Sequence, residues 1–451
     1  MLTHQYPRLL MVTQGTFNFL SGTGITFTNL FHGWPQKKIA SIHQDSVPPS
    51  TGVCTRYYKL TEREFPYGWP YSLKYHFRHY RQKNQNALPS SKSVYVSVMV
   101  EKKSLIYFIK KILAIPKQFI FGDVLPERTI LSEELKTWIE DYKPEVLYTI
   151  LGSLSQIRLV RKIVEKYRLP LVIHMMDDWP SSLYRKGLFD IYRRHAMKRE
   201  LKSLLKLATR CLSISDIMAE KFLKRYSVPF TTFHNAVDGD EWKLKSRKNW
   251  KRGNPFIMIY AGAIMQNSQL QSVADTADAV ASLFQDGKHI KFDIYAPWYM
   301  SSQYREVLER PGCVSVSDAP DNIDITNLFS KADLLLLPVN FDRTSIRFIR
   351  YSMPTKVPAY MFSGTPTLAY GPAHVASIDY ALNYQWAYCV TKRDQKLLAN
   401  AIRQLYADEN LRASIARRAY LLACERHDQK NVIPLFHRVF ALAAKEGTIR
   451  R

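Results

Sequence analysis

The sequence lacks three things that would place it in familiar classes: paired cysteines, long apolar runs and a balance of acidic residues. Its five cysteines are odd in number and widely spaced, with no CxxC pair. That pattern argues against a disulfide framework and a structural zinc site, and it favours a reducing cytoplasm. No charge-free stretch of about 18 apolar residues occurs, so we expect neither a membrane-spanning helix nor a cleaved secretion signal.

Acidic residues are outnumbered, since 64 Lys and Arg face 39 Asp and Glu for a net charge of +25. Residues 1–240 hold 36 basic and 20 acidic residues, a net charge of +16. Such a surplus attracts polyanions, which include nucleic acid, anionic lipid headgroups and phosphorylated small molecules. No basic run interleaved with stacking aromatics is recognisable as a nucleic-acid module, so nucleic acid ranks last among these partners.

Apolar residues are plentiful, at 46% of 451 residues with 13% aromatic. That composition builds two or three packed domains and excludes disorder for most of the chain. Short β-branched runs alternate with helical stretches, a pattern typical of parallel βα units. The predicted strands are Leu9–Thr13, Ile39–His43, Val94–Val100, Val146–Ile150, Leu171–Met175, Cys211–Ser215 and Thr231–His234, followed by Phe256–Ala261, Phe292–Tyr295, Val314–Val316, Asp333–Pro338, Thr367–Tyr370 and Ala387–Val390.

A polar, charged stretch, Asp238–Asn254, separates the two sets of strands and is interpreted as an interdomain connection. We therefore predict an α/β protein of two tandem Rossmann-like domains, 1–238 and 239–430, that face a central cleft. A C-terminal helix within 431–451 is expected to pack back on the first domain. In such folds the ligand binds at the carboxyl ends of the strands.

Glycine is scarce, with 17 in the chain, yet Gly15, Gly22 and Gly24 fall between the first strand and the next helix. Glycines there let a phosphate approach the amides at a helix start, although a plain tight turn explains them equally well. The stretch is not a Walker A motif and lacks the third glycine of the dinucleotide fingerprint.

The segment His174-Met175-Met176-Asp177-Asp178 follows the fifth strand, where α/β sites gather. We expect His174 to hydrogen-bond into the cleft and one aspartate to cap the next segment. A metal held by these three side chains is a weaker alternative, because one short turn seldom supplies enough ligands. Asp238-Gly239-Asp240 copies a DxD metal signature, but its place in the connection favours a solvated turn.

The densest chemistry lies in Leu334–Pro372. After a buried strand we predict a loop with Arg343, Arg347 and Arg350, and then a helix that begins at Ser352-Met353-Pro354-Thr355-Lys356. A cation near the positive end of a helix is unfavourable unless an anion neutralises it, so the segment predicts a diphosphate seat. A solvated basic face is the alternative.

One further segment, Glu101–Phe121, places apolar residues at helical spacing among four lysines. It fits an anionic membrane surface, and an ordinary helix with a lysine-rich solvent face fits equally well.

In order and spacing, these motifs resemble those of GT-B-fold glycosyltransferases of the family 4 type. The main match is Ser352-x-Pro354-x-Lys356-x-x-Ala359-Tyr360-Met361-x-x-Gly364-Thr365-Pro366, which is similar to the SxPxKxxEYMxxGxP stretch of that family's donor-binding domain. The stretches Ser213–Asp216, His234–Asp238, Tyr260–Gly262 and Ala332–Pro338 support it. Four positions depart from the family. Ala263 replaces an arginine, and Ser268 or Gln269 stands near the place of a lysine. Ala359 replaces the glutamate that grips the ribose, and Tyr351 replaces its partner.

The resemblance implies transfer of a sugar from a nucleotide-sugar donor to a glycan or lipid-linked acceptor, with retention and without a metal or other cofactor. It implies a role in polysaccharide or glycoconjugate assembly, in the cytoplasm or at the inner face of an anionic membrane. The implied catalytic residues are His174, on the transferred sugar, with Arg347 and Lys356. The implied donor-binding residues are Gly22, Thr23, Gly24, Gly262, Ala263, Arg343, Lys356, Ala359 and Tyr360, and Asp177 and Asp178 lie on the acceptor side.

Two alternatives remain open. A catalytically silent GT-B scaffold that binds a partner or glycan would explain the missing carboxylate at Ala359. A nucleic-acid-binding protein would explain the net charge of +25 and predicts strongly salt-sensitive binding.

Overall fold

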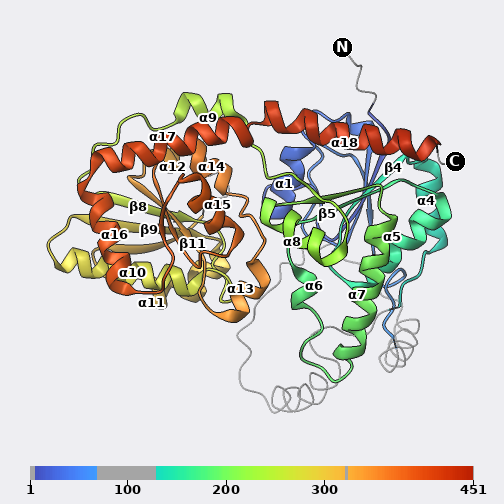
Figure 1. Ribbon diagram of the computed structural model, residues 1–451, viewed down its shortest axis with the longest axis horizontal. Coiled ribbons are helices and arrows are strands. Elements are labelled where there is room, and N and C mark those ends of the chain that lie inside the picture. Colours follow the sequence, from blue (N-terminus) through green and yellow to red (C-terminus); the bar gives the residue numbers. More distant parts are fainter. Residues whose placement is uncertain (1–5, 69–127, 320–323, 450–451) are drawn as a thin grey trace, which may run out of the picture.

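The computed structural model describes residues 6–68, 128–319 and 324–449, and these form two α/β units around two parallel sheets (Figure 1). The first sheet has seven strands in the order β3-β2-β1-β4-β5-β6-β7, and the second has six in the order β10-β9-β8-β11-β12-β13. Both follow the Rossmann order: successive strands are added on one side of the first strand of the sheet, and later strands are then added on its other side. The predicted α/β fold with two Rossmann-like sheets is therefore confirmed.

Several strands are completely buried. Strands β1, β2, β5 and β11 are buried at every position, as expected for parallel strands covered by helices on both faces. The first sheet consists of β1 (Leu9–Thr13), β2 (Ile39–His43), β3 (Arg56–Lys59), β4 (Val146–Ile150), β5 (Leu171–Met175), β6 (Arg210–Ser213) and β7 (Thr231–Thr232). The second consists of β8 (Phe256–Ala261), β9 (Ile290–Ala296), β10 (Val314–Asp318), β11 (Leu334–Pro338), β12 (Thr367–Tyr370) and β13 (Tyr388–Val390).

Helices alternate with these strands, and several begin at a serine or aspartate cap. Around the first sheet lie α1 (Gly22–Leu30), a short 3-10 helix (Gln36–Lys38), α4 (Glu133–Tyr142), α5 (Leu154–Tyr167), α6 (Trp179–Ser182), α7 (Asp190–Leu207) and α8 (Asp216–Tyr226). The remaining helices are α9 (Gly239–Lys245), α10 (Leu270–Gln285), α11 (Trp298–Leu308), α12 (Ile325–Lys331), α13 (Arg343–Ile349), α14 (Val357–Phe362), α15 (Ala376–Tyr384), α16 (Gln395–Ala407), α17 (Glu409–Arg426) and α18 (Gln429–Ile449).

Two consecutive helices run along one side of the molecule and link its two halves (Figure 1). Helix α17 packs on α14 of the second half, and α18 packs on α1, β4 and β5 of the first. Phe436 and Phe440 of α18 contact the rings of Phe31 and Tyr148. The C-terminal helix thus returns to the first sheet, while the predicted domain boundaries stay a prediction.

Two local predictions were wrong, and two elements were not predicted. The arginine-bearing segment after β11 is not a loop but helix α13, because Asp342 caps it by accepting the amides of Thr344 and Ser345. The next helix, α14, begins at Val357 and not at Ser352. The connection after β7 contains helix α9, and edge strand β3 was missed because its residues show no apolar run. The predicted strand Val94–Val100 and the segment Glu101–Phe121 lie outside the described residues.

Candidate functional site

Loops from the carboxyl ends of the first sheet meet the segment that joins α13 to α14. The hydrogen bonds that connect them include Ser215 Oγ to the Tyr351 carbonyl (2.7 Å), Ser352 Oγ to Asp177 Oδ1 (2.5 Å), and Asn235 Nδ2 to the Thr355 carbonyl (2.9 Å). The carboxyl ends of the strands in both sheets therefore point towards a shared junction. Open α/β sheets bind ligands at the carboxyl ends of their strands, at the point where the strand order reverses.

The glycine-rich turn after β1 is built around the side chain of Asn18. Its Oδ1 accepts the amides of Leu20 and Ser21, and Ser21 in turn caps α1 through the Gly24 amide. A Cβ at Gly24 would lie 2.4 Å from Asn18, so the need for glycine there is explained by packing. Gly22 differs, because it faces the second half: a Cβ there would lie 3.1 Å from Thr355 Oγ1.

Lys356 immediately precedes α14 and reaches back towards β8. Its Nζ donates to the Ala261 carbonyl (2.8 Å) and lies 4.1 Å from the centre of the Tyr260 ring. Among the described residues no carboxylate pairs with this ammonium group, and burial lowers the pKa of Lys356 to about 7. Gly262 makes room for it, since a Cβ at Gly262 would lie 2.4 Å from Nζ. This is a cation held in position without its own counter-ion.

The exposed side chains of Arg343 and Arg347 lie one turn apart on α13. Helix α13 packs on α6 of the first half. The charge of Arg347 helps to lower the pKa of Arg185 there, after the larger effect of burial, so these two guanidinium groups are neighbours. Thr23, also exposed, lies on the first turn of α1.

His174 does not reach the junction, and its predicted contact with the transferred sugar is corrected. The side chain is fully buried on the face of β5 that α18 covers, with the Phe436 ring 6.3 Å away. Its Nδ1 shares a hydrogen bond with the Tyr148 hydroxyl (2.9 Å). Burial lowers the pKa of His174 to about 3, so the ring is neutral and packs in the core. Successive side chains of a strand point to opposite faces of the sheet, and the motif alone did not show which face His174 takes. In the structure it points into the core.

The two aspartates after β5 have different surroundings. Asp177 lies at the junction, where it accepts the Ser352 hydrogen bond, and burial, together with the charge of Asp178, raises its pKa. Asp178 is 2% exposed and accepts two hydrogen bonds from the Arg225 guanidinium, at 2.6 and 3.1 Å. That ion pair uses both carboxylate oxygens of Asp178. The side chain therefore stabilises the fold, and the prediction that it lies on the side of the sugar acceptor is corrected.

Three further predicted donor-binding positions differ in accessibility. Tyr360 is fully buried with its ring 4.9 Å from that of Phe329, so its side chain belongs to the core and not to the cleft. Ala359 and Ala263 are half-buried. The Tyr260 hydroxyl donates to the Ala263 carbonyl and so fixes the turn after β8.

Asn340 was not singled out from the sequence, although it positions this turn. It is fully buried just after β11; its Nδ2 donates to the Gln266 carbonyl (2.9 Å), and its Oδ1 accepts the Ser272 amide (3.2 Å). A polar residue three positions after four consecutive leucines was the available signal. The Asp238-Gly239-Asp240 motif starts α9, with Asp238 as the cap and Asp240 paired with Lys430. Both aspartates are exposed, so the motif is solvated as predicted, but it begins a helix and does not form a separate turn.

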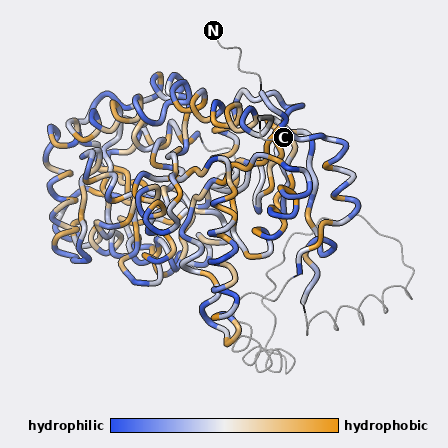
Figure 2. Tube along the Cα trace, turned by 45° about the vertical axis from the view of Figure 1, so that its right-hand side comes forward, coloured by the Kyte–Doolittle hydropathy of each residue, from blue (hydrophilic) through white to orange (hydrophobic). Residues whose placement is uncertain are grey.

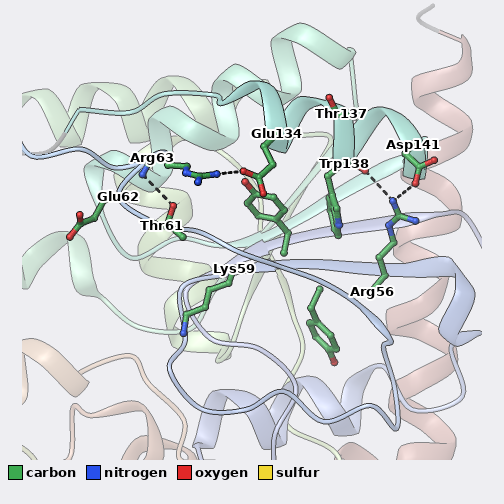
Figure 3. A pocket seen from close by; sticks show the side chains of 11 residues that line it. Arg56, Lys59, Thr61, Glu62, Arg63, Glu134, Thr137, Trp138 and Asp141 are labelled. Atoms are coloured by element: carbon green, nitrogen blue, oxygen red, sulfur yellow. Dashed lines mark hydrogen bonds and ion pairs between the residues drawn. The ribbon is translucent and has the colours of Figure 1, made fainter. Parts of the chain in front are cut away.

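A separate open pocket of about 980 Å³ lies at the outer edge of the first sheet, between β3 and α4 (Figure 3). Two ion pairs, Arg56 with Asp141 and Arg63 with Glu134, cross it, and Arg56 stacks on Trp138. None of the predicted site residues lines it. Within the described ranges no group of three or more metal-ligating side chains is present, and no helix there is long and apolar enough to cross a bilayer.

No protein-family model matches the chain, and no curated protein sequence matches it. Its fold is nevertheless similar to solved glycosyltransferase structures. HepE from Anabaena in complex with UDP matches with a TM-score of 0.59 at 12% identity, covering 96% of this chain and 99% of that one. The trehalose-6-phosphate synthase OtsA matches with 0.60 at 10% (97% and 99%), and WaaG, a glycosyltransferase involved in lipopolysaccharide biosynthesis, with 0.58 at 11% (96% and 99%). These matches establish the GT-B fold of the chain.

Proposed function

We propose that the protein is a glycosyltransferase that moves a sugar from a nucleotide-sugar donor to a glycan or lipid-linked acceptor. The observation that carries this proposal is Lys356, whose buried ammonium group has no carboxylate partner among the described residues. It lies where loops of both sheets meet in a fold shared with enzymes solved with UDP and UDP-glucose. A bound diphosphate would supply the missing negative charge.

The chemistry follows from the leaving group. Release of a nucleoside diphosphate builds negative charge on its outer phosphate, so fixed cations aimed there stabilise the transition state more than the ground state. Lys356 supplies one such charge, and Arg343 and Arg347 supply others from α13. The backbone at Gly262 and Ala263 approaches the diphosphate from the second half, and Gly22, Thr23 and Gly24 approach it from the first. Closure of the two halves then excludes water.

The family resemblance of the Ser352–Pro366 motif adds retention at the anomeric carbon to the proposal. We propose no metal and no other cofactor, because cationic side chains supply the positive charge that a metal would otherwise provide. Asp177 stays on the acceptor side, since it lies at the junction beside Ser352. Removal of divalent metals with a chelator is expected to leave the rate unchanged.

The acceptor and location follow from charge. The first half of the chain carries most of the positive surplus, and in this fold it receives the acceptor. An acceptor attached to a lipid at the inner face of an anionic membrane fits this distribution better than a nucleic acid. The proposal therefore assigns the protein to polysaccharide or glycoconjugate assembly in the cytoplasm.

A thermal-shift screen with UDP-, GDP-, dTDP- and CMP-sugars tests the donor. The native protein should be stabilised by one class of nucleotide sugar, and Lys356→Ala should lose most of that shift. Lys396→Ala, at an exposed lysine on α16, is the matched control. Absence of any shift with all four classes, or an equal shift in both variants, contradicts the proposal.

A catalytically silent GT-B scaffold is a second candidate, and one observation favours it. Position 359, where the resembled family carries a ribose-binding glutamate, is Ala359. A silent scaffold would bind a nucleotide or glycan but would neither transfer nor hydrolyse any donor. Release of free sugar from the donor identified by thermal shift would exclude it.

A further inference from the structure

The turn before α7 is an ordered projection. Asp190, at the start of the helix, is 2% exposed; its Oδ2 accepts the amides of Lys186 (3.0 Å) and Gly187 (2.8 Å), and its Oδ1 pairs with Arg193 (3.2 Å). The one acidic group in the turn is therefore directed inward and neutralised. Its hydrogen bonds fix the turn, so the side chains that point outward are held there by the fold.

Those outward side chains are apolar. Leu188, Ile191 and Tyr192 are 60%, 61% and 75% exposed. The start of α7 projects beyond the rest of the described chain, and its tip is coloured hydrophobic (Figures 1 and 2). Single exposed apolar residues are ordinary, but a cluster on a projecting tip marks an interaction site.

Cations surround this tip. Arg185 lies before the apolar residues, Arg194 follows them by half a turn, and Lys198 and Arg199 lie one to two turns further along α7. Among the described residues none of these four pairs with a carboxylate, and the pKa of Arg185 is lowered by burial and then by the charges of Arg347 and Arg194. The other acidic residue of α7, Glu200, is held by Arg158 at 2.7 Å.

The shape and the charge favour one partner. Three projecting side chains bury much less than the roughly 1,000 Å² of a stable protein interface. A bilayer suits them better, because aliphatic residues and a tyrosine enter the headgroup boundary while the basic residues around them meet anionic lipids. We propose that the α7 tip, defined as Leu188, Ile191 and Tyr192 with Arg185, Arg194, Lys198 and Arg199, docks the protein on a membrane that contains anionic lipid.

Docking there deepens the proposed function. Helix α6 lies just before the tip in the chain and packs on α13, which carries Arg343 and Arg347. A membrane-bound tip would bring this side of the junction close to the bilayer and present a lipid-linked acceptor to it. This consequence rests on the proposed sugar transfer, whereas the docking itself requires no substrate.

Co-sedimentation of the full chain with vesicles tests the docking, using phosphatidylcholine alone and an equimolar mixture with phosphatidylglycerol. We expect binding to the mixed vesicles that weakens as salt rises. Ile191→Glu should weaken it at least about tenfold, because an apolar contact is lost and a repelled charge is added. The double variant Lys198→Glu/Arg199→Glu should weaken it by at least about 25-fold, because loss of each basic charge costs about fivefold and the added glutamates are repelled as well.

Matched controls separate the tip from general surface changes. Leu244→Glu alters an 85% exposed leucine on α9, and Lys392→Glu/Lys396→Glu alters two exposed lysines of the second half. Both should bind like the native protein. The docking proposal is overturned if the native protein ignores the lipid charge, or if Ile191→Glu and Leu244→Glu bind alike.

Two further measurements complete the test. A change in oligomeric mass of Ile191→Glu, with vesicle binding intact, would assign the tip to a second copy of the chain and overturn docking. The thermal shift with nucleotide sugars should be unchanged in Ile191→Glu. A protein that docks but responds to no donor would remove the proposed transfer while supporting the docking, so the two failures are distinguishable.

Discussion

Ser352 donates a hydrogen bond to Asp177 across the junction of the two halves, with Oγ 2.5 Å from Oδ1. The bond joins the carboxyl end of β5 to the segment before α14. Other hydrogen bonds cross the same junction, so the carboxylate contributes to holding the two halves together.

Two replacements of Asp177 are expected to distinguish the contribution of its hydrogen bond to stability from that of its charge. Burial raises the pKa of Asp177 above its ordinary value, so the carboxyl group ionises more readily in the unfolded state than in the folded state. The free energy of unfolding therefore falls as the pH rises through the folded-state pKa. Asp177→Asn keeps an acceptor for Ser352 and removes that cost, so it should be at least as stable as the native protein at pH 7. Asp177→Ala should lose about 1 kcal/mol.

Urea unfolding at pH 7 and pH 3.5 measures both effects. The advantage of Asp177→Asn over the native protein should shrink at the lower pH, where the native carboxyl group is protonated. An advantage that grows as the pH falls would contradict the assigned direction of the pKa change.

Lys356→Met is expected to gain stability and lose donor binding. Burial lowers the pKa of Lys356 to about 7, so between pH 7 and its ordinary value of 10.5 the unfolded state binds more protons and native stability rises with pH. Methionine removes the buried charge and this dependence. The variant should therefore melt at a higher temperature at pH 7, yet bind a nucleotide sugar at least about tenfold more weakly.

The pH dependence of donor affinity gives a second readout. Native affinity should fall by up to about tenfold per pH unit above pH 7, as the lysine loses its proton. Lys356→Met should show no such fall, and Lys396→Met should behave like the native protein. Titrations monitored by calorimetry would reveal a flat native profile if the lysine did not contact the diphosphate.

Gly262→Ala is expected to displace Lys356. The backbone at Gly262 has φ +142°, and a Cβ there would lie 2.4 Å from Nζ. Gly287→Ala is the matched control, because Gly287 has φ +77° and no atom near its Cβ position. Both variants should lose about 1 kcal/mol or more through backbone strain, but only Gly262→Ala should also weaken donor binding. Equal donor affinities would contradict this placement of Lys356.

Three buried histidines predict strong acid sensitivity. Burial lowers the pKa of His174 and His234 to about 3 and that of His427 well below its ordinary value. Each is neutral in the folded state, so its contribution is present above pH 6.5 and is lost as the pH falls below that value. The free energy of unfolding should drop by up to about 4 kcal/mol per pH unit there, or about 1.4 for each histidine.

Denaturant titrations between pH 7 and pH 5 measure this slope. His174→Leu should make it shallower by about one third. Tyr148→Phe, which removes the hydrogen-bond partner of His174, should cost about 1 kcal/mol without changing donor binding. A loss of donor affinity in Tyr148→Phe would indicate that His174 contributes to donor binding and would contradict its assignment to the core.

The sequence by itself determined most of the fold. Buried strands such as Leu9–Thr13 and Thr367–Tyr370 form as predicted, because runs of apolar residues bounded by turns are local signals that do not depend on distant contacts. The resemblance carried by the motif from Ser352 to Pro366 implied a GT-B fold, and that fold is confirmed. Capping by Asp342 was equally local, but the arginines after it were interpreted as a loop.

Only the tertiary structure decided which polar side chains reach the junction. His174 and Asp177 stand three residues apart in one motif, yet one is enclosed beneath α18 and the other meets Ser352 from the second half. Asp178 is neutralised by Arg225, 47 residues away in the chain, whereas no carboxylate in the described part of the chain pairs with Lys356. Partners that are distant in sequence determine burial and charge compensation, and a local pattern carries no information about them.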